Sequence, residues 1–210
     1  VARTSDVLIL AVKPYQYEDV IGQIKNEVTD ETLVISIAAG QTIDRIRNFF
    51  GRDVKIVRTM PNTPALVGEG ATGMCFCDNI GSEDCAKAKK IFESFGVVCV
   101  VEERLMDVVV GVSGSSPAYV YMIIEAMADA AVSEGLSRED AYRLAAQSVM
   151  GAAKMVVETG EHPGILKDRV CSPGGTTMAG VKALEEAGLR GTIMDGICAG
   201  IYRAKEMSDN

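Results

Sequence analysis

Six consecutive residues late in the chain are suited to binding an anion. The stretch from Ser172 to Thr177 reads Ser-Pro-Gly-Gly-Thr-Thr, and adjacent glycines permit tight turns and close approach of a ligand to the main chain. Apolar residues then recur at three-residue spacing, which predicts a helix. A turn that opens a helix presents free backbone N–H groups at the positive end of the helix dipole. The stretch therefore predicts a site for a carboxylate or phosphate, or, more plainly, a helix start capped by a threonine.

Three loops in the first half of the chain are the other candidate site. Short apolar runs predict strands at 7–12, 33–37 and 54–57. The segments at their carboxyl ends are Ala11-Val12-Lys13-Pro14, Ala38-Ala39-Gly40 and Arg58 to Pro64. Each carries small residues, Pro or Gly, so the backbone is accessible to a flat ligand. Because ligands of α/β proteins sit beyond the carboxyl ends of parallel strands, the three loops together predict a cleft.

The elements that position these loops alternate between strand and helix. Two more strands are expected at 70–77 and 97–101, and helical patterns cover 15–28, 42–50 and 82–95. Near-continuous apolar strands separated by helices predict an α/β domain, with a Rossmann-like parallel sheet covered on both faces. The letters Gly68-x-Gly70-x-x-Gly73 match a dinucleotide-binding turn. They precede a strand instead of following one, so they are not such a turn.

The second half of the chain is expected to be all helical. Ser116-Pro117 opens one helix, Ser137 with Asp140 forms a capping-box-like start for the next, and 189–207 forms the last. Many small residues and a broad apolar surface predict closely packed helices and a subunit interface. We therefore expect a partial Rossmann-like domain at 1–101 and a helical domain at 102–210.

Composition and charge narrow the class of protein. The 210 residues are 48% apolar and 24% charged, which is ordinary for a globular protein, and the net charge of −8 argues against nucleic acid and anionic membranes as partners. The apolar runs are too short to span a bilayer, and no signal peptide is visible. The six cysteines contain no C-x-x-C pair, which indicates reduced thiols in the cytoplasm.

Other reactive side chains are better explained as structural. Glu125 and Asp129 lie four residues apart on one predicted helix face, which is more typical of a polar stripe than of a catalytic pair. His162 precedes Pro-Gly and is expected to be structural. The sequence contains no convincing Ser-His-Asp, Cys-His or metal-binding constellation, so no metal is expected.

Taken together, the motifs resemble those of the pyrroline-5-carboxylate reductase family. The matching pieces occur in the family's order across almost the whole chain, and the last one is the family's signature. They are Ile9–Pro14, Ser36–Gly40, Met60–Pro64, Ser113–Tyr119 and Val170–Thr177. The chain departs from the family at Ser116, where the family has Gly. It also lacks the N-terminal dinucleotide fingerprint, which is expected to lie before Val1.

The resemblance implies a reaction and a set of site residues. The reaction is reduction of 1-pyrroline-5-carboxylate to L-proline with NADPH or NADH, the last step of proline biosynthesis. The resemblance also implies a homodimer formed through the helical domain, and larger rings of dimers. Thr177 matches the threonine whose hydroxyl meets the substrate's ring nitrogen. The implied substrate-binding residues are Ser172, Gly174, Gly175, Thr176 and Thr177. The implied cofactor-binding residues are Ala11, Val12, Lys13, Pro14, Ile37, Ala38, Ala39 and Asn62.

Two alternative functions stay open at this point. A reductase related to the β-hydroxyacid dehydrogenases has the same layout and uses a lysine on a second-domain helix. Here Lys154 and Lys182 are the only candidates for that lysine. The second alternative is that the chain, lacking the phosphate-binding unit, only self-associates and has no catalytic activity.

Overall fold

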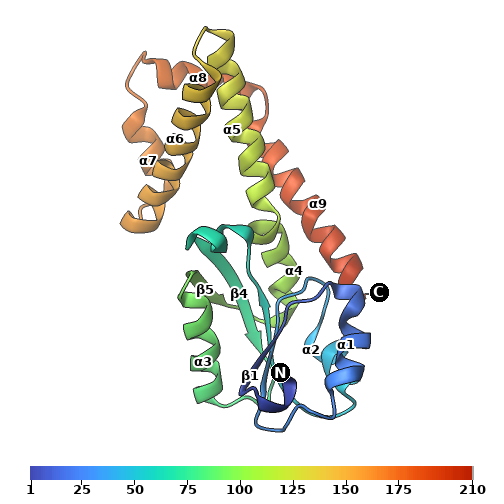
Figure 1. Cartoon of the computed structure of the whole chain (residues 1–210). Coiled ribbons are helices and arrows are strands. Elements are labelled where there is room, and N and C mark those ends of the chain that lie inside the picture. Colours follow the sequence, from blue (N-terminus) through green and yellow to red (C-terminus); the bar gives the residue numbers. More distant parts are fainter. Residues whose placement is uncertain (210) are drawn as a thin grey trace. The chain divides into compact units, whose positions relative to one another are not determined.

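The computed structural model describes residues 1–209, which form two compact units (Figure 1). Val1–Pro117 and Ile197–Asn210 make up the first, here called the sheet unit. Ala118–Gly196 make up the second, here called the helical unit. The sheet unit thus includes the end of the last helix, a division that differs from a single boundary at residue 101.

The sheet unit contains a five-stranded sheet in the order β1-β2-β3-β4-β5. The strands are β1 (Val7–Leu10), β2 (Leu33–Ser36), β3 (Lys55–Met60), β4 (Gly70–Phe76) and β5 (Gly96–Val100). Strands β1, β2 and β3 are parallel, and Leu10, Ser36 and Arg58 align across them. The loops that follow these three strands therefore emerge at one edge of the sheet, as predicted.

The sheet is mostly parallel, as expected, and departs from the predicted parallel arrangement only where β4 pairs with β3. Strand β4 pairs antiparallel with β3, and β5 runs parallel to β4. A parallel pair needs a long crossover, whereas residues 61–69 between β3 and β4 contain only a short 3₁₀ helix, Thr63–Val67. The apolar run 70–77 indicated a buried strand correctly but carried no information about its direction.

Helices cover both faces of this sheet (Figure 1). Helices α1 (Tyr17–Ile24) and α2 (Ile43–Phe50) pack with β1, β2 and β3 in one core, and α3 (Ser82–Glu93) packs on the opposite side. The first core is centred on fully buried side chains such as Tyr17, Ile21 and Ile46. Thr42 caps α2 by accepting a hydrogen bond from the Arg45 backbone N–H (3.1 Å), which explains where that helix begins.

The helical unit is built from long helices whose ends follow local signals. They are α5 (Ser116–Ser133), α6 (Arg138–Thr159), α7 (Pro163–Val170), α8 (Thr176–Glu186) and the start of α9 (Leu189–Asp209). A short helix α4 (Met106–Val109) and a π-helical turn precede α5 in the sheet unit. Ser137 caps α6 through the Asp140 backbone N–H (3.1 Å), as the sequence predicted. His162 caps α7 through the Gly164 backbone N–H (3.1 Å), which gives it the structural role expected.

Much of the apolar surface of α5 lacks cover within the chain. The sequence analysis found every apolar run too short to span a bilayer. In the structure, Glu103–Ser133 forms one helical stretch that is long and apolar enough to do so by length and composition alone. Only 6% of its most apolar window is buried. A protein–protein interface explains such a surface equally well.

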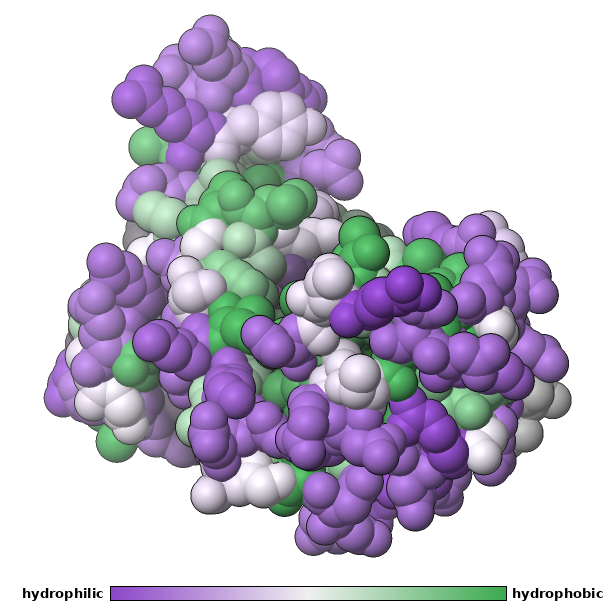
Figure 2. All heavy atoms as spheres, turned by 60° about the horizontal axis from the view of Figure 1, so that its bottom comes forward, coloured by the Kyte–Doolittle hydropathy of each residue, from purple (hydrophilic) through white to green (hydrophobic). Residues whose placement is uncertain are grey.

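The face of the molecule brought forward in Figure 2 is largely hydrophilic. Ion pairs near the amino ends of the parallel strands include Arg3–Glu27, Arg52–Asp30 and Lys55–Glu31. All six cysteines are free thiols. Burial raises the pKa of the Cys75 thiol to about 12, so it stays protonated at neutral pH.

Candidate functional site

The loops after β1 and β2 form an open cavity of about 510 Å³. Its lining includes seven of the eight residues expected to bind the cofactor: Ala11, Val12, Lys13, Pro14, Ile37, Ala38 and Ala39. Short side chains at three of these positions leave the main chain accessible. The cavity lies at the carboxyl ends of parallel strands, where α/β proteins bind their ligands.

A buried tyrosine fixes the strand ends from which these loops emerge. The Tyr17 hydroxyl donates to the Leu10 carbonyl (2.8 Å) at the end of β1 and lies 2.9 Å from the Ser36 hydroxyl at the end of β2. Burial raises the pKa of Tyr17. The Thr59 hydroxyl in turn donates to the Ser36 carbonyl (2.8 Å). The three parallel strand ends are therefore linked by side-chain hydrogen bonds that the sequence analysis did not anticipate.

The end of helix α9 also supports the loop after β2. Gly40 has φ +73°, and a Cβ there would lie 3.0 Å from the Met207 carbonyl oxygen. Both residues belong to the sheet unit. A glycine is thus required where the last helix approaches the Ala38–Gly40 loop. No pattern in the sequence connects residues so distant along the chain.

Asn62 does not join the other predicted cofactor residues in the loop cavity. It lies beside a neighbouring cavity of about 480 Å³ that shares only Ile37 with the first. Its side-chain amide donates to the Ser113 carbonyl (3.0 Å) and accepts from the Ala71 backbone N–H (2.9 Å). These bonds hold the loop after β3 against β4 and the π-helical turn, which is a structural role.

Arg58 is part of β3, and not of the loop in which the sequence analysis placed it. It is 3% exposed and pairs with Glu103 (3.2 Å) and Asp107 (3.3 Å). Glu103 also accepts from the Ile43 backbone N–H (2.7 Å), and Asp107 from the Ser208 hydroxyl (2.8 Å). Buried charge requires such partners. One sequence pattern could have indicated these partners of Arg58: Glu103 and Asp107 are four residues apart, which places them on one helix face.

The predicted anion site is an exposed turn at the start of α8 in the helical unit. Gly174 has φ +68°, which other residues rarely adopt. The Gly175 backbone N–H donates to the Ser172 carbonyl (3.0 Å), and a Cβ at Gly175 would lie 2.4 Å from the Ser172 hydroxyl oxygen. The two adjacent glycines therefore serve different purposes, the first for a left-handed backbone and the second for a close approach.

Helix α8 begins without a side-chain cap. Gly175 is the N-cap residue, so Thr176 and Thr177 occupy the first turn of the helix, and the expected threonine cap is wrong. The first backbone bond shown at this end runs from Ala179 to Gly175 (3.3 Å). The amides of Thr176 to Met178 precede it, so they have no acceptor within the helix. The Thr177 hydroxyl makes no hydrogen bond to any residue between 1 and 209.

The remaining candidates have ordinary structural roles. Lys154 and Lys182 pair with acids one helical turn away, Glu158 (3.4 Å) and Glu186 (3.7 Å). Asp129 pairs with Arg138, consistent with a polar stripe on α5. Residues 1–209 contain no cluster of three or more metal-ligand side chains.

Two family models match separate parts of the chain. The model described as "Pyrroline-5-carboxylate reductase dimerisation" matches residues 103–207. A model described as "NADP oxidoreductase coenzyme F420-dependent" matches residues 1–40. The first covers the helices with uncovered apolar surface, and the second covers β1 and part of the loop cavity.

Curated relatives and solved structures agree with the first model. The pyrroline-5-carboxylate reductase of Escherichia coli K12 is 50% identical over 208 residues, covering 99% of this chain and 77% of that protein. A Coxiella burnetii pyrroline-5-carboxylate reductase superposes with a TM-score of 0.93 at 39% identity, covering 99% of this chain and 77% of the other. The Plasmodium falciparum enzyme with NADP bound gives 0.91 at 38% identity, covering 99% and 79%. The chain belongs to the pyrroline-5-carboxylate reductase family.

Proposed function

We propose that this protein reduces 1-pyrroline-5-carboxylate to L-proline with NADPH or NADH, and that the segment from Ser172 to Thr177, at the start of α8, holds the substrate's carboxylate. The observation that carries the proposal is the exposed turn at the start of an eleven-residue helix with no side-chain cap. Membership of the family supports the reaction.

The carboxylate site follows from the geometry of α8. The amides of Thr176, Thr177 and Met178 precede the first backbone bond of the helix. They lie at the positive end of the helix dipole, where an anion is stabilised. Hydrogen bonds to a charged acceptor are also stronger than neutral ones. The substrate carries one carboxylate, which matches a site built from backbone donors.

Thr177 is the residue that we assign to the imine. Its hydroxyl has no partner within residues 1–209 and is half-buried in the first turn of α8. It is therefore free to bond the ring nitrogen and orient one face of the ring. A protonated imine is already electrophilic, so positioning is the main demand on the protein. The ring carbon of the C=N bond accepts a hydride, and the nitrogen retains its proton, which gives L-proline.

The loop cavity fits a nicotinamide cofactor. Ala11, Ala38 and Ala39 leave room for a flat ring against the main chain, and Lys13 and Pro14 border the same cavity. When bound, the cofactor supplies the hydride. Tyr17 and Thr59 hold the strand ends that carry these loops. Asn62 acts here by fixing the neighbouring loop through Ser113 and Ala71.

The helical part of the chain indicates how the protein assembles, and the cysteines and net charge indicate where it is located. We infer a homodimer through the helices of 102–210, because the dimerisation model covers 103–207. Rings of dimers as the larger assembly are inferred from the resemblance to the family alone. In this view residues 1–101 belong to the cofactor-binding domain. Reduced cysteines and a net charge of −8 favour a cytoplasmic enzyme without nucleic-acid or membrane partners.

Substitution of Thr177 tests the proposed role of its hydroxyl. We expect Thr177→Val to lower kcat by about 10- to 100-fold, which corresponds to loss of a buried hydrogen bond. Folding and NADPH affinity should be unchanged. Thr192→Val is the matched control, because its hydroxyl donates only to the carbonyl of Gly188, the residue just before its helix (3.2 Å). Wild-type turnover in Thr177→Val would remove this residue from the mechanism.

Titration with NADPH separates an active reductase from a module that only self-associates. An active reductase binds NADPH and oxidises it only when pyrroline-5-carboxylate is present. A self-associating module forms the dimer but neither binds nor oxidises the cofactor, and this result would overturn the proposed function.

A further inference from the structure

The end of α9 belongs to the sheet unit and packs closely within it. Residues from Ile197 onward lie in this unit, and Ala204 among them is 3% exposed. A Cβ at Gly111, in the π-helical turn, would lie 2.4 Å from the Ile201 Cγ1 atom and 3.1 Å from the Ile197 carbonyl oxygen. A glycine is therefore required where this turn meets α9.

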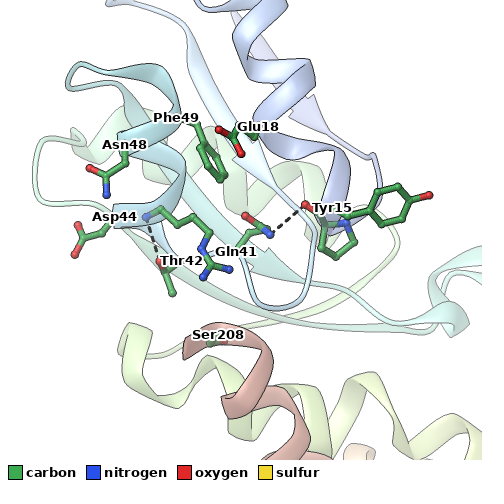
Figure 3. Close-up of a pocket in the computed structure, with 10 residues that line it drawn as sticks. Tyr15, Glu18, Gln41, Thr42, Asp44, Asn48, Phe49 and Ser208 are labelled. Carbon is green, nitrogen blue, oxygen red and sulfur yellow. Dashed lines mark hydrogen bonds between the residues drawn. The ribbon is translucent and has the colours of Figure 1, made fainter. Parts of the chain in front are cut away.

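The final turn of α9 contacts the loop that follows β2. The Met207 carbonyl oxygen lies 3.0 Å from the place that a Cβ at Gly40 would take, and Gly40 is buried. Figure 3 shows Ser208 at the end of α9, where it borders an open cavity of about 580 Å³ together with the residues that lead from this loop into α2. Ala38 and Ala39, directly before Gly40, line the loop cavity. The contact with α9 is thus one residue away from the proposed cofactor site.

A hydrogen bond between Ser208 and Asp107 fixes this final turn. The Ser208 hydroxyl donates to the Asp107 carboxylate (2.8 Å), and the same carboxylate oxygen pairs with Arg58 (3.3 Å). Arg58 is 3% exposed and also pairs with Glu103 (3.2 Å). Because a buried guanidinium holds the acceptor in place, the Ser208 hydroxyl bonds a charged group of fixed position. Hydrogen bonds to charged groups are stronger than neutral ones.

The same cluster of charges holds the far end of the loop. The Glu103 carboxylate accepts from the Ile43 backbone N–H (2.7 Å), at the first residue of α2. At the near end, Ser36 is held by the buried hydroxyl bonds described above. The loop of residues 37–42 is therefore fixed at both ends by buried side chains, and α9 restrains its middle.

We infer that Ser208 is a positioning residue for cofactor binding. Its bond to Asp107 keeps the final turn of α9 against Gly40. This contact holds the main chain of Ala38 and Ala39 in the shape that accepts the nicotinamide. Ser208 lies outside the lining of the loop cavity, so it acts through the loop and does not touch the cofactor. The inference rests on the proposed function, which places the cofactor in that cavity.

Hydrogen–deuterium exchange of the cofactor-free protein tests the contact between α9 and the loop. Ser208→Ala should speed amide exchange in residues 37–42 about fivefold, because the loop opens more often when the final turn of α9 is released. Residues 11–16 supply the other loop of the cavity and should exchange at the wild-type rate. The matched control is Ser94→Ala, whose hydroxyl donates to the Ile91 carbonyl (2.6 Å) at the exposed end of α3 and which should change neither segment. Unchanged exchange in residues 37–42 of Ser208→Ala would overturn the inference.

NADPH titration of the same variants tests the effect on the cofactor. Ser208→Ala should raise the NADPH Kd about fivefold, the size expected for loss of one hydrogen bond. The KM for pyrroline-5-carboxylate at saturating NADPH should stay unchanged. Ser208→Thr keeps the hydroxyl, so its NADPH Kd should stay within about twofold of the wild-type value.

Two results of this titration would overturn the inference while leaving the proposed function intact. One is a wild-type NADPH Kd in Ser208→Ala, and the other is the same NADPH Kd in the alanine and threonine variants. Absence of NADPH binding by the wild-type protein would instead overturn the proposed function, and the cofactor role of Ser208 with it.

Discussion

The sheet unit and the helical unit contain similar apolar side chains but bury them differently. The sheet unit has two cores of fully buried Ile, Val, Leu and aromatic residues on opposite faces of the sheet. In the described part of 118–196, the only buried residues are three alanines, Ala128, Ala141 and Ala145. Large apolar side chains such as Met122 and Leu144 are instead more than 60% exposed. The sheet unit is therefore stabilised from within, and the helical unit requires a partner surface.

The largest expected effect comes from charging the exposed apolar face of the helical unit. Met122→Glu combined with Leu144→Glu should raise the dimer dissociation constant at least about a thousandfold, because burying unpaired charge costs several kcal/mol. Sedimentation velocity over a range of concentrations measures this constant. The matched control is Leu66→Glu with Val67→Glu in the sheet unit, whose side chains are 90% and 77% exposed. If the control dissociates the dimer and the first variant does not, the comparison between the units is wrong.

The next largest effect concerns the buried charge of the sheet unit. Arg58→Met should lower the free energy of unfolding by about 3 kcal/mol, because Glu103 and Asp107 lose their buried counter-charge. Urea denaturation measures this change. Lys55→Met is the control on the same strand. The Lys55 side chain is 22% exposed against 3% for Arg58, so its pairs with Glu31 and Asp84 should contribute less than about 1 kcal/mol. Equal effects of both substitutions would show that burial does not set the strength of these pairs.

A smaller effect is expected at the strand ends below the loop cavity. Tyr17→Phe should lower the free energy of unfolding by about 2 kcal/mol, because the Leu10 carbonyl and Ser36 hydroxyl lose a buried partner. It should also weaken NADPH binding by loosening the loops. Tyr15→Phe is the control, because Tyr15 is 81% exposed and its change should stay within about 0.5 kcal/mol. Unchanged stability and cofactor affinity in Tyr17→Phe would separate these bonds from the site.

The sequence predicted what depends on short-range patterns. Apolar runs located all five strands, and the capping pattern at Ser137 marked the start of α6 correctly, because caps depend only on neighbouring residues. The first three strands were predicted to be parallel, so their carboxyl ends were expected at one edge of the sheet. The loops at Ala11 and Ala38 do line one cavity there.

The sequence did not predict what depends on contacts between distant segments. The reversal of β4 depends on the conformation of residues 61–69, and an apolar strand reads the same in either direction. Arg58 was assigned to a loop because the apolar run ends at Val57, and its partners lie 45 and 49 residues away, where no local pattern reveals them. The contact between Gly40 and Met207 and the internal bonds of Asn62 were missed for the same reason. The polarity of a short segment does not show which polar groups form hydrogen bonds or ion pairs with one another in the fold.

The central claim is that the diglycine turn before α8 binds the substrate's carboxylate, and Gly175→Val tests it most directly. A side chain there would collide with Ser172 and distort the turn. Steady-state kinetics should show a KM for pyrroline-5-carboxylate raised at least about tenfold, the size expected when a charge-assisted hydrogen bond is lost. The KM for NADPH should stay unchanged. Gly180→Val, on the same helix with no atom within 4 Å of an added Cβ, is the control. A wild-type KM for pyrroline-5-carboxylate in Gly175→Val would contradict the account.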